Sequence, residues 1–253
     1  MKVLFDEYFY TVYTRDPAAE PGRMESVIRA LPEYAEVVRP DYASEKQILL
    51  AHTRHHVDDV KRQGLYDVAA LAAGAAIDTA RIGLEEPAFG AIRPPGHHAS
   101  ADSSWGFCYF NNMAIALLAL HAEKHIRTAM VLDIDLHYGD GTDNILGGKH
   151  WVKTFNIAKN SRDKSLYEVE QILSENRVDL IGISAGFDNH MNDWGGLMAT
   201  GDYRAIGRMV RQAAKNAGGG CFALLEGGYN HNVLGRNAAA LMDGLWKPDE
   251  DLN

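Results

Sequence analysis

The chain has 253 residues, of which 46% are hydrophobic and 23% charged, so it can bury a large core and has an ordinary globular composition. The 34 acidic residues outnumber the 25 lysines and arginines, which gives a formal net charge of -9. Because no run of basic residues is present, this balance argues against a broad nucleic-acid-binding surface. A cationic substrate remains compatible with it, since an acidic surface attracts cations.

Cysteine usage and hydropathy indicate the redox environment of the chain and its relation to membranes. Cys108 and Cys221 make neither a disulfide framework nor a zinc-finger spacing, so we expect a reducing, cytoplasmic environment. The N-terminal segment does not resemble a signal peptide, and no apolar stretch is long enough to span a membrane, so no membrane association is expected. Without a linker, repeat or low-complexity tract, residues 1–253 are expected to form a single domain.

Apolar runs that predict strands alternate with segments that predict helices. A short strand is expected at 3–5, and further strands within 88–98, 129–141, 180–188 and 221–229. Helices are expected over 21–31, 44–60, 67–81, 113–125, 163–176 and 202–217, the second of them opened by a capping box of Ser44 and Gln47. This alternation is typical of an α/β fold in which helices cover both faces of a parallel sheet.

Polar residues gather where four of the expected strands end. They are His97 and His98 after the first, Asp133, Asp135, His137 and Asp140 after the second, Asp188 after the third and Tyr229 after the fourth. In open parallel sheets, ligands bind outside the carboxyl ends of the strands. We therefore expect these side chains to meet along one edge of the sheet.

The segment Asp135-Leu136-His137 is the sharpest local signal for a metal. On an extended segment, residues i and i+2 point to the same side, so Asp135 and His137 face one point. Asp188 supplies a third ligand. Two carboxylates and one imidazole suit Zn²⁺ or Fe²⁺ and leave a position open for water and substrate. An isolated Asp-x-His is more often a helix cap beside a core histidine, but the other polar clusters favour the metal.

Two histidines and two carboxylates suit acid–base chemistry. His97 and His98 follow a Pro-Pro-Gly segment that predicts a rigid loop, and one imidazole can take a proton while the other holds charge. Asp133 or Asp140 beside such an imidazole would fix its tautomer and stabilise its protonated form. The alternative for the histidines is an exposed loop, and for Asp140 an ordinary Asp-Gly turn.

Aromatic and remaining histidine residues are less specific. Tyr229 follows two glycines, and its phenol could donate a hydrogen bond to a developing oxyanion, although an ordinary buried tyrosine is the alternative. The aromatic stretch 105–112 either walls a channel or belongs to the core. We expect His55 and His56 on a solvated helix face, and His190 in a structural role.

Five motifs, in order, resemble the histone deacetylase family, including its bacterial and archaeal deacetylase-like members and its acetylpolyamine amidohydrolases. They are RPPGHHA (93–99), GFCYFNN (106–112), DIDLHYGDGT (133–142), SAGFD (184–188) and LEGGYN (225–230). The resemblance implies the arginase/deacetylase fold, a single α/β domain with a central, mostly parallel sheet of about eight strands and helices on both faces.

The resemblance also implies roles for the matching positions. It makes Asp135, His137 and Asp188 the zinc ligands, His97 and His98 the tandem histidines with Asp133 and Asp140 as their respective partners, and Tyr229 the residue that polarises the carbonyl. Gly106, Phe107 and Gly227 would contact substrate, and the backbone around Asp133, Asp135 and His137 would hold a structural K⁺. Arg23 is a weaker match to an arginine that lines an internal acetate cavity.

The chain departs from the family pattern around the substrate. The segment between GDGT and SAGFD is shorter than usual, so a second phenylalanine wall of the substrate tunnel has no clear match. The stretch between Val60 and Tyr66 is also short, and the acidic residue that grips the substrate backbone has no match either. Residues 193–196 read Asp-Trp-Gly-Gly where the family has Asp-Pro-Leu-Gly. We therefore expect a different tunnel rim around an unchanged chemistry.

Together these features predict a zinc-dependent amidohydrolase that removes acetyl groups from amines by metal-activated water. The substrate is either a small acetylated amine such as an acetylpolyamine, towards which the acidic balance leans, or acetyl-lysine in a protein. His98 is favoured as general base and acid. Two alternatives stay open, a binuclear-manganese ureohydrolase of the arginase type and a non-catalytic protein that binds acetylated amines. The choice of Zn²⁺ or Fe²⁺ and the assembly of identical chains into an oligomer also stay open.

Overall fold

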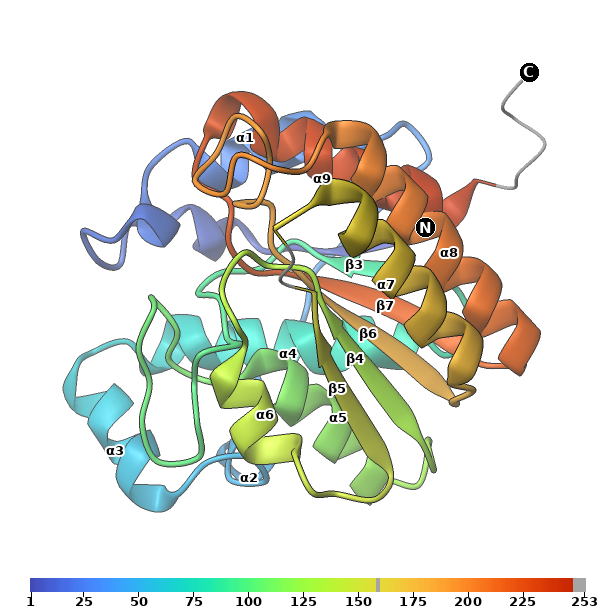
Figure 1. Ribbon diagram of the computed structural model, residues 1–253. Helices are drawn as coiled ribbons and strands as arrows, with labels where there is room; N and C mark the ends of the chain where they lie inside the picture. Colours follow the sequence, from blue (N-terminus) through green and yellow to red (C-terminus); the bar gives the residue numbers. More distant parts are fainter. Residues whose placement is uncertain (158–159, 248–253) are drawn as a thin grey trace.

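A computed structural model describes residues 1–157 and 160–247, which are built around one parallel sheet (Figure 1). Its strands lie in the order β2-β1-β3-β7-β6-β4-β5, and every pairing is parallel. The strands are β1 (Lys2–Leu4), β2 (Glu36–Val38), β3 (Ala88–Gly90), β4 (Ala129–Asp133), β5 (Val152–Asn156), β6 (Leu180–Ala185) and β7 (Gly220–Leu225). Within the described ranges the sheet has seven strands, close to the expected eight, and the predicted α/β class is confirmed.

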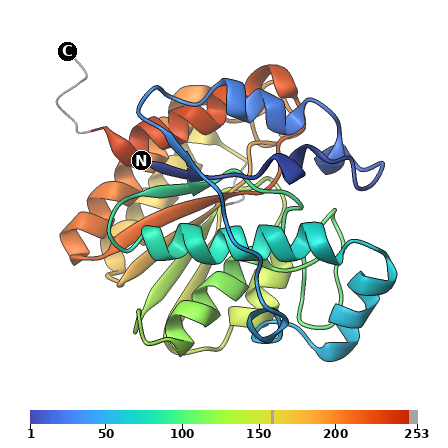
Figure 2. The ribbon, with the colours of Figure 1, turned by 180° about the vertical axis from the view of Figure 1, so that it is seen from behind.

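Helices cover both faces of this sheet. They are α1 (Arg23–Arg29), α2 (Glu45–Ile48), α3 (Arg54–Arg62), α4 (Tyr66–Ile82), α5 (Asn112–Ala122), α6 (Asp140–Leu146), α7 (Arg162–Glu175), α8 (Thr200–Ala217) and α9 (His231–Trp246), with short 3₁₀ turns at Glu7–Tyr10 and Pro17–Ala19. α4, α5 and α6 lie on one face, and α1, α7, α8 and α9 lie on the other (Figure 1). The view from behind shows the same two layers (Figure 2). Across the described residues, no helix is long and apolar enough to cross a membrane.

The helix expected over 44–60 is instead two helices, α2 and α3. The predicted capping box is present, because the Ser44 side chain accepts from the Gln47 N–H while Gln47 accepts from the Ser44 N–H. The Thr53 hydroxyl then caps the start of α3 by accepting the His56 N–H. Each of the two N-cap residues satisfies free N–H groups at the start of its own helix, so the segment forms two helices instead of one.

The expectation for the α3 histidines is right for His55 and wrong for His56. The side chain of His55 is 69% exposed, whereas His56 is buried and its Nε2 lies 2.7 Å from the Tyr109 carbonyl oxygen. A backbone carbonyl in the loop before α5 offers this imidazole a partner, and a hydrogen-bonded histidine can be buried at little cost. The neighbouring His52 ties the same loop down, since its Nε2 accepts the Asn111 N–H.

α4 is buried on nearly all sides, as its small apolar residues predicted. One glycine in it allows a close approach by the preceding segment. A Cβ at Gly74 would lie 2.0 Å from the Asp41 carbonyl oxygen, so only glycine lets residues 41–43 pass over the helix. The core on both sides of the sheet is apolar, and each fully buried Leu or Ile contributes about 1.5–3 kcal/mol to stability.

Strand register brings four chain segments to one edge of the sheet. Asp133 in β4 lies opposite Ser184 in β6, Ser184 lies opposite Leu224 in β7, and Leu224 lies opposite Gly90 in β3. Because all four strands run in the same direction, the residues that follow them emerge side by side. This edge carries the polar clusters that the sequence singled out.

Candidate active site and metal centre

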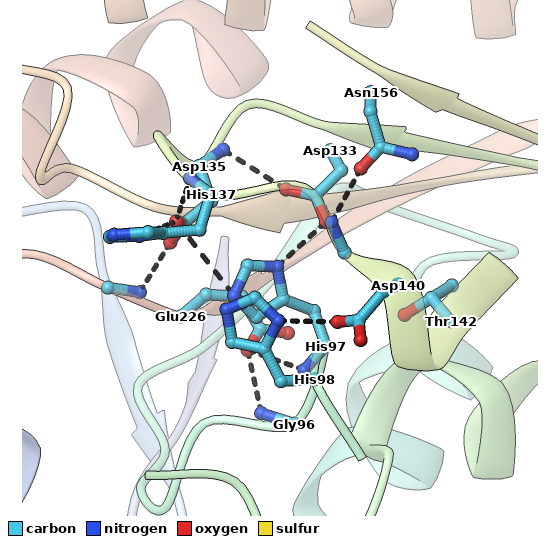
Figure 3. Close-up of polar contacts among 12 residues, drawn as sticks. Gly96, His97, His98, Asp133, Asp135, His137, Asp140, Thr142, Asn156 and Glu226 are labelled. Carbon is cyan, nitrogen blue, oxygen red and sulfur yellow. Dashed lines mark hydrogen bonds and ion pairs between the residues drawn. The ribbon is translucent and has the colours of Figure 1, made fainter. Parts of the chain in front are cut away.

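Asp135, His137 and Asp188 converge as the sequence predicted, and Figure 3 shows the first two of them. Each offers one ligand atom, and these atoms lie within 4.8 Å of one another. His137 Nδ1 lies 3.2 Å from Asp135 Oδ1 and 3.0 Å from Asp188 Oδ2. Both carboxylates are buried, whereas the His137 side chain is 37% exposed. The site is therefore open to solvent on its histidine side.

The surroundings of these residues fit a divalent cation. Asp188 Oδ2 is buried, and apart from the His137 ring 3.0 Å away it has no donor among the described residues. Burial together with the charge of Asp135 raises the pKa of Asp188 to about 6. Two buried carboxylates around one imidazole are costly, and a metal ion is one way to satisfy them. A Cβ at Gly227 would lie 2.6 Å from Asp135 Oδ2 and 3.0 Å from Asp188. Gly227 thus keeps this space free.

Backbone donors orient the two carboxylates. Asp135 Oδ2 accepts the Gly227 N–H and Asp188 Oδ1 accepts the Leu136 N–H, at 2.9 and 3.1 Å. Hydrogen bonds from outside the ligand set fix the direction of metal ligands in this way. With two oriented carboxylates and one imidazole, the residues present fit Zn²⁺ or Fe²⁺ with an open coordination position.

A second cation is compatible with the segment beneath this site. The Ser184 hydroxyl is buried and has no hydrogen-bond partner among the described residues. Ser184 lies opposite Asp133 in the sheet register, next to the backbone that the family resemblance assigns to K⁺. An oxygen without a partner at this point fits a hard cation, which prefers oxygen ligands.

Each tandem histidine has its own carboxylate partner. His97 Nδ1 lies 2.9 Å from Asp133 Oδ2, and His98 Nδ1 lies 2.7 Å from Asp140 Oδ1 (Figure 3). Both rings are only 3% exposed, so the alternative of exposed loop histidines is wrong. With Nδ1 engaged, each ring has Nε2 left for the site, and His97 Nε2 lies 3.8 Å from Asp135 Oδ1.

The two imidazoles sit in different electrostatic environments. Burial opposes a charge on His97, but the carboxylates of Asp133 and Asp135 outweigh it and raise the pKa of His97 well above its ordinary value. Burial and the charge of His97 lower the pKa of His98 to about 4, although Asp140 acts in the opposite direction. Without a bound metal, these shifts favour a charged His97 and a neutral His98 at neutral pH, which suits a charge-holding role for one ring and a proton-accepting role for the other.

Tyr229 completes the group from the segment after β7. Burial raises the pKa of its phenol, which therefore stays protonated and can donate a hydrogen bond. Asp193 Oδ2 accepts the N–H groups of both Tyr229 and Asn230, at 2.9 and 2.8 Å. The Tyr229 ring stacks on Trp194 and meets Phe107 edge to face.

Gly106 and Phe107 turn the preceding loop against the histidines. Both have left-handed backbones, with φ of 59° and 66°. A Cβ at Gly106 would lie 2.3 Å from His98 Cδ2, so glycine lets the loop pass directly over this ring. A left-handed phenylalanine is uncommon and marks a constrained position.

Arg23 is buried beside Tyr229. Its Nε donates to the Gly228 carbonyl at 2.9 Å and its Cζ lies 5.7 Å from the centre of the Tyr229 ring. Nη1 has no hydrogen-bond partner among the described residues. His190 has a structural role as expected, since its Nδ1 accepts the Asn192 N–H and its Nε2 contacts Thr200.

Sequence reasoning missed the contacts by which three residues support the site. Trp105 packs on His98 and donates from Nε1 to Asp140 Oδ2 at 2.9 Å, and Trp194 stacks on Tyr229. Glu226 is buried, and its Oε2 accepts the N–H groups of Gly96 and His97, at 2.7 and 3.2 Å. Trp105 precedes the GFCYFNN motif, Trp194 lies in the altered segment 193–196 and Glu226 lies inside the LEGGYN motif, but nothing in their spacing indicates these contacts.

Comparison with known proteins identifies the family. A model of the histone deacetylase domain matches residues 18–167 and 165–245. The chain is 32% identical over 273 residues to a probable deacetylase of Archaeoglobus fulgidus, covering 86% of this chain and 74% of that protein. It is 29% identical over 260 residues to a histone deacetylase-like amidohydrolase of Pseudomonas aeruginosa, covering 80% and 68%.

A solved structure matches the fold. The crystal structure of the HDA15 HD domain superposes with a TM-score of 0.84 at 24% identity, covering 96% of this chain and 88% of that one. The domain match spans most of the chain, and the archaeal relative is similar over most of its length. The chain therefore belongs to the histone deacetylase family.

Proposed function

We propose that this chain is a zinc-dependent amidohydrolase that removes the acetyl group from an acetylated amine. The observation that carries the proposal is the meeting of three metal-ligand side chains, two unequal histidines and a protonated phenol at one sheet edge. Relatives named as a probable deacetylase and as a deacetylase-like amidohydrolase support the reaction type.

The metal would be held by Asp135, His137 and Asp188. When bound there, Zn²⁺ supplies Lewis acidity towards the acyl carbonyl and lowers the pKa of a water molecule. Fe²⁺ suits the same ligands. In the described ranges this is the one cluster of three or more potential ligands within coordination distance, which favours a mononuclear hydrolase over a binuclear ureohydrolase.

His98 transfers the proton, and His97 stabilises the developing negative charge. His98 is neutral at pH 7 and its Nδ1 is held by Asp140, so its Nε2 is free to take a proton from the attacking water. The same nitrogen then delivers that proton to the leaving amine. His97, charged beside Asp133, stays protonated and stabilises the negative charge that develops on the acyl oxygen.

Tyr229 stabilises the oxyanion as a second donor. Its phenol stays protonated because burial raises its pKa, so it can donate a hydrogen bond to the developing charge. Loss of such a donor costs about 100- to 1,000-fold in rate. A pure binding protein has no need of a neutral base, a charged imidazole and an oxyanion donor together, so the catalytic role is the better explanation of the set.

The substrate we propose is a small acetylated amine, with acetyl-lysine in a protein as the second candidate. The exposed edge of His137 gives a substrate direct access to the metal ligands, and the net charge of -9 favours cationic molecules.

The buried free thiols of Cys108 and Cys221 suit a reducing cytoplasm, which we propose as the setting of this protein.

Acetate release tests this function. The protein loaded with Zn²⁺, and in parallel with Fe²⁺, is assayed against acetylputrescine, acetylspermidine, acetylcadaverine and an acetyl-lysine peptide. We expect turnover that falls about 100-fold or more in Tyr229→Phe and disappears in Asp188→Ala. Full activity in either variant would contradict the proposal. A stoichiometry of two bound metal ions per chain would instead support the binuclear ureohydrolase.

A further inference from the structure

Six aromatic side chains form a continuous series of ring contacts at the metal site. We call it the aromatic collar. In order along the series, the members are Trp105, His98, His137, Trp194, Tyr229 and Phe107, with consecutive ring centroids 3.8, 6.0, 6.1, 4.0 and 5.9 Å apart. His137 belongs both to the collar and to the proposed metal ligands. Gly106 joins Phe107 back to Trp105 through the backbone. We call the exposed side of the collar, at Trp105, His137 and Trp194, its mouth.

Trp105 and Trp194 stand apart from the other members because they are exposed. Their exposed fractions are 56% and 54%, whereas His98 is 3% exposed and Tyr229 is partly buried. The two indoles are three ring contacts apart through His98 and His137. Each covers a site residue with one side of its ring, Trp105 on His98 and Trp194 on Tyr229. The rest of each indole faces the solvent at the mouth.

A carboxylate accompanies each of these tryptophans. Asp140 accepts the Trp105 indole N–H, and the Asp140 side chain remains 44% exposed. Burial raises the pKa of Asp140, but hydrogen bonds from His98 and Trp105 outweigh burial and hold it below its usual value. Asp193 directly precedes Trp194 and accepts its backbone N–H at 2.8 Å. Aromatic faces next to negative charge attract cations.

We propose that Trp105 and Trp194 are specificity-determining residues that bind a cationic ammonium group on the amine side of the substrate. The inference rests on the proposed function in that an acylated amine enters this mouth. It names the substrate class as acetylated diamines and polyamines, whose carbon chain ends in an ammonium. Acetyl-lysine in a protein is disfavoured, because its carbon chain ends at a neutral peptide backbone.

A matched pair of amides tests the charge preference. N-acetyl-1,4-diaminobutane and N-pentylacetamide have the same length and differ at the terminal ammonium or methyl group. We expect the wild type to favour the cation in kcat/KM. Trp194→Ala and Trp105→Ala should each lower the cation-to-neutral ratio about 2- to 30-fold. Trp194→Phe keeps an aromatic face and should retain most of the ratio. Trp246→Phe is the control, because Trp246 packs on Tyr34 outside the collar.

Binding without turnover separates this inference from the proposed function. Calorimetry with both amides in the Tyr229→Phe background, with and without Trp194→Ala, measures the same ratio as a difference in Kd. If the ratio falls in the tryptophan variants while no acetate is released by the wild type, cation binding by the tryptophans is supported and the proposed reaction fails. If acetate is released but both alanine variants keep the wild-type ratio, cation binding by the tryptophans is refuted and the reaction stands. A wild-type preference for the neutral amide also refutes cation binding by the tryptophans.

Discussion

Trp194 stacks on Tyr229, with ring centroids 4.0 Å apart and an angle of 25° between the ring planes. The residue before it, Asp193, accepts the backbone N–H of Tyr229. One dipeptide therefore holds both the ring and the backbone of the residue that we propose as oxyanion donor. The loop after β6 positions the segment after β7, although the two are remote in sequence.

Asp193→Ala should lower kcat about 10- to 100-fold because Tyr229 and Asn230 lose their shared backbone acceptor. The substrate still reaches the mouth, so we expect little change in KM. Asp193→Asn retains one side-chain oxygen as acceptor and should lose much less. Steady-state kinetics on the preferred acetylated amine measures both variants. A rise in KM at constant kcat would show that Asp193 acts on substrate binding instead of on Tyr229.

Asp140→Asn should lower kcat because the amide no longer stabilises a charged His98 ring or fixes its tautomer. Loss of a supporting carboxylate of this kind typically costs about 10- to 100-fold. Trp105→Phe is a useful comparison, since it removes the indole N–H donated to Asp140 but keeps a ring over His98. We expect a smaller loss in that variant. Equal losses in both would assign the main effect to the Trp105–Asp140 hydrogen bond.

Local patterns in the sequence predicted the parts of the site that lie on strand ends. The alternation of side chains in an extended segment placed Asp135 and His137 on one side, and Asp188 follows a parallel strand in the same sheet. The capping box of Ser44 and Gln47 was equally predictable, because all of its atoms lie within one turn. These features need only the residues close to them in the chain.

Features that depend on a distant partner could not be predicted. His56 is buried because its Nε2 has a partner in the Tyr109 carbonyl oxygen, which lies 2.7 Å away and 53 positions along the chain. Trp194 reaches Tyr229 across a separation set by the sheet order β7-β6. Composition and spacing carry no information on such pairs, since they arise only after the strands have assembled.

The buried carboxylate of Glu226 should make stability depend on pH. Burial raises its pKa to about 7 in the folded chain, against an ordinary value of 4.5. A group with a raised folded pKa stabilises the fold fully below its unfolded pKa, and that stabilisation is lost as pH rises through the folded value. The window therefore runs from about pH 4.5 to about pH 7.

Glu226→Gln removes this titration while keeping a side-chain oxygen for the N–H groups of Gly96 and His97. Relative to the wild type, the variant should gain about 1–3 kcal/mol of unfolding free energy between about pH 5 and about pH 8. Denaturant unfolding of the metal-free proteins at both pH values measures the difference. A constant offset between wild type and variant would mean that Glu226 does not titrate in this range.

Zinc binding should release a proton and stabilise the fold. Hydrogen bonds to Asp135 and Asp188 raise the pKa of His137 to about 10 in the metal-free protein, so an ion that takes this imidazole as ligand must displace its proton. Calorimetry in buffers of different ionisation enthalpy should report release of about one proton near pH 7. A chelator should lower Tm, and Zn²⁺ should restore it, because the metal binds only the folded ligand set. In His137→Ala the proton release should vanish and the Zn²⁺-dependent rise in Tm should shrink. Unchanged proton release in that variant would place the displaced proton on another group, with Asp188 as the nearest candidate.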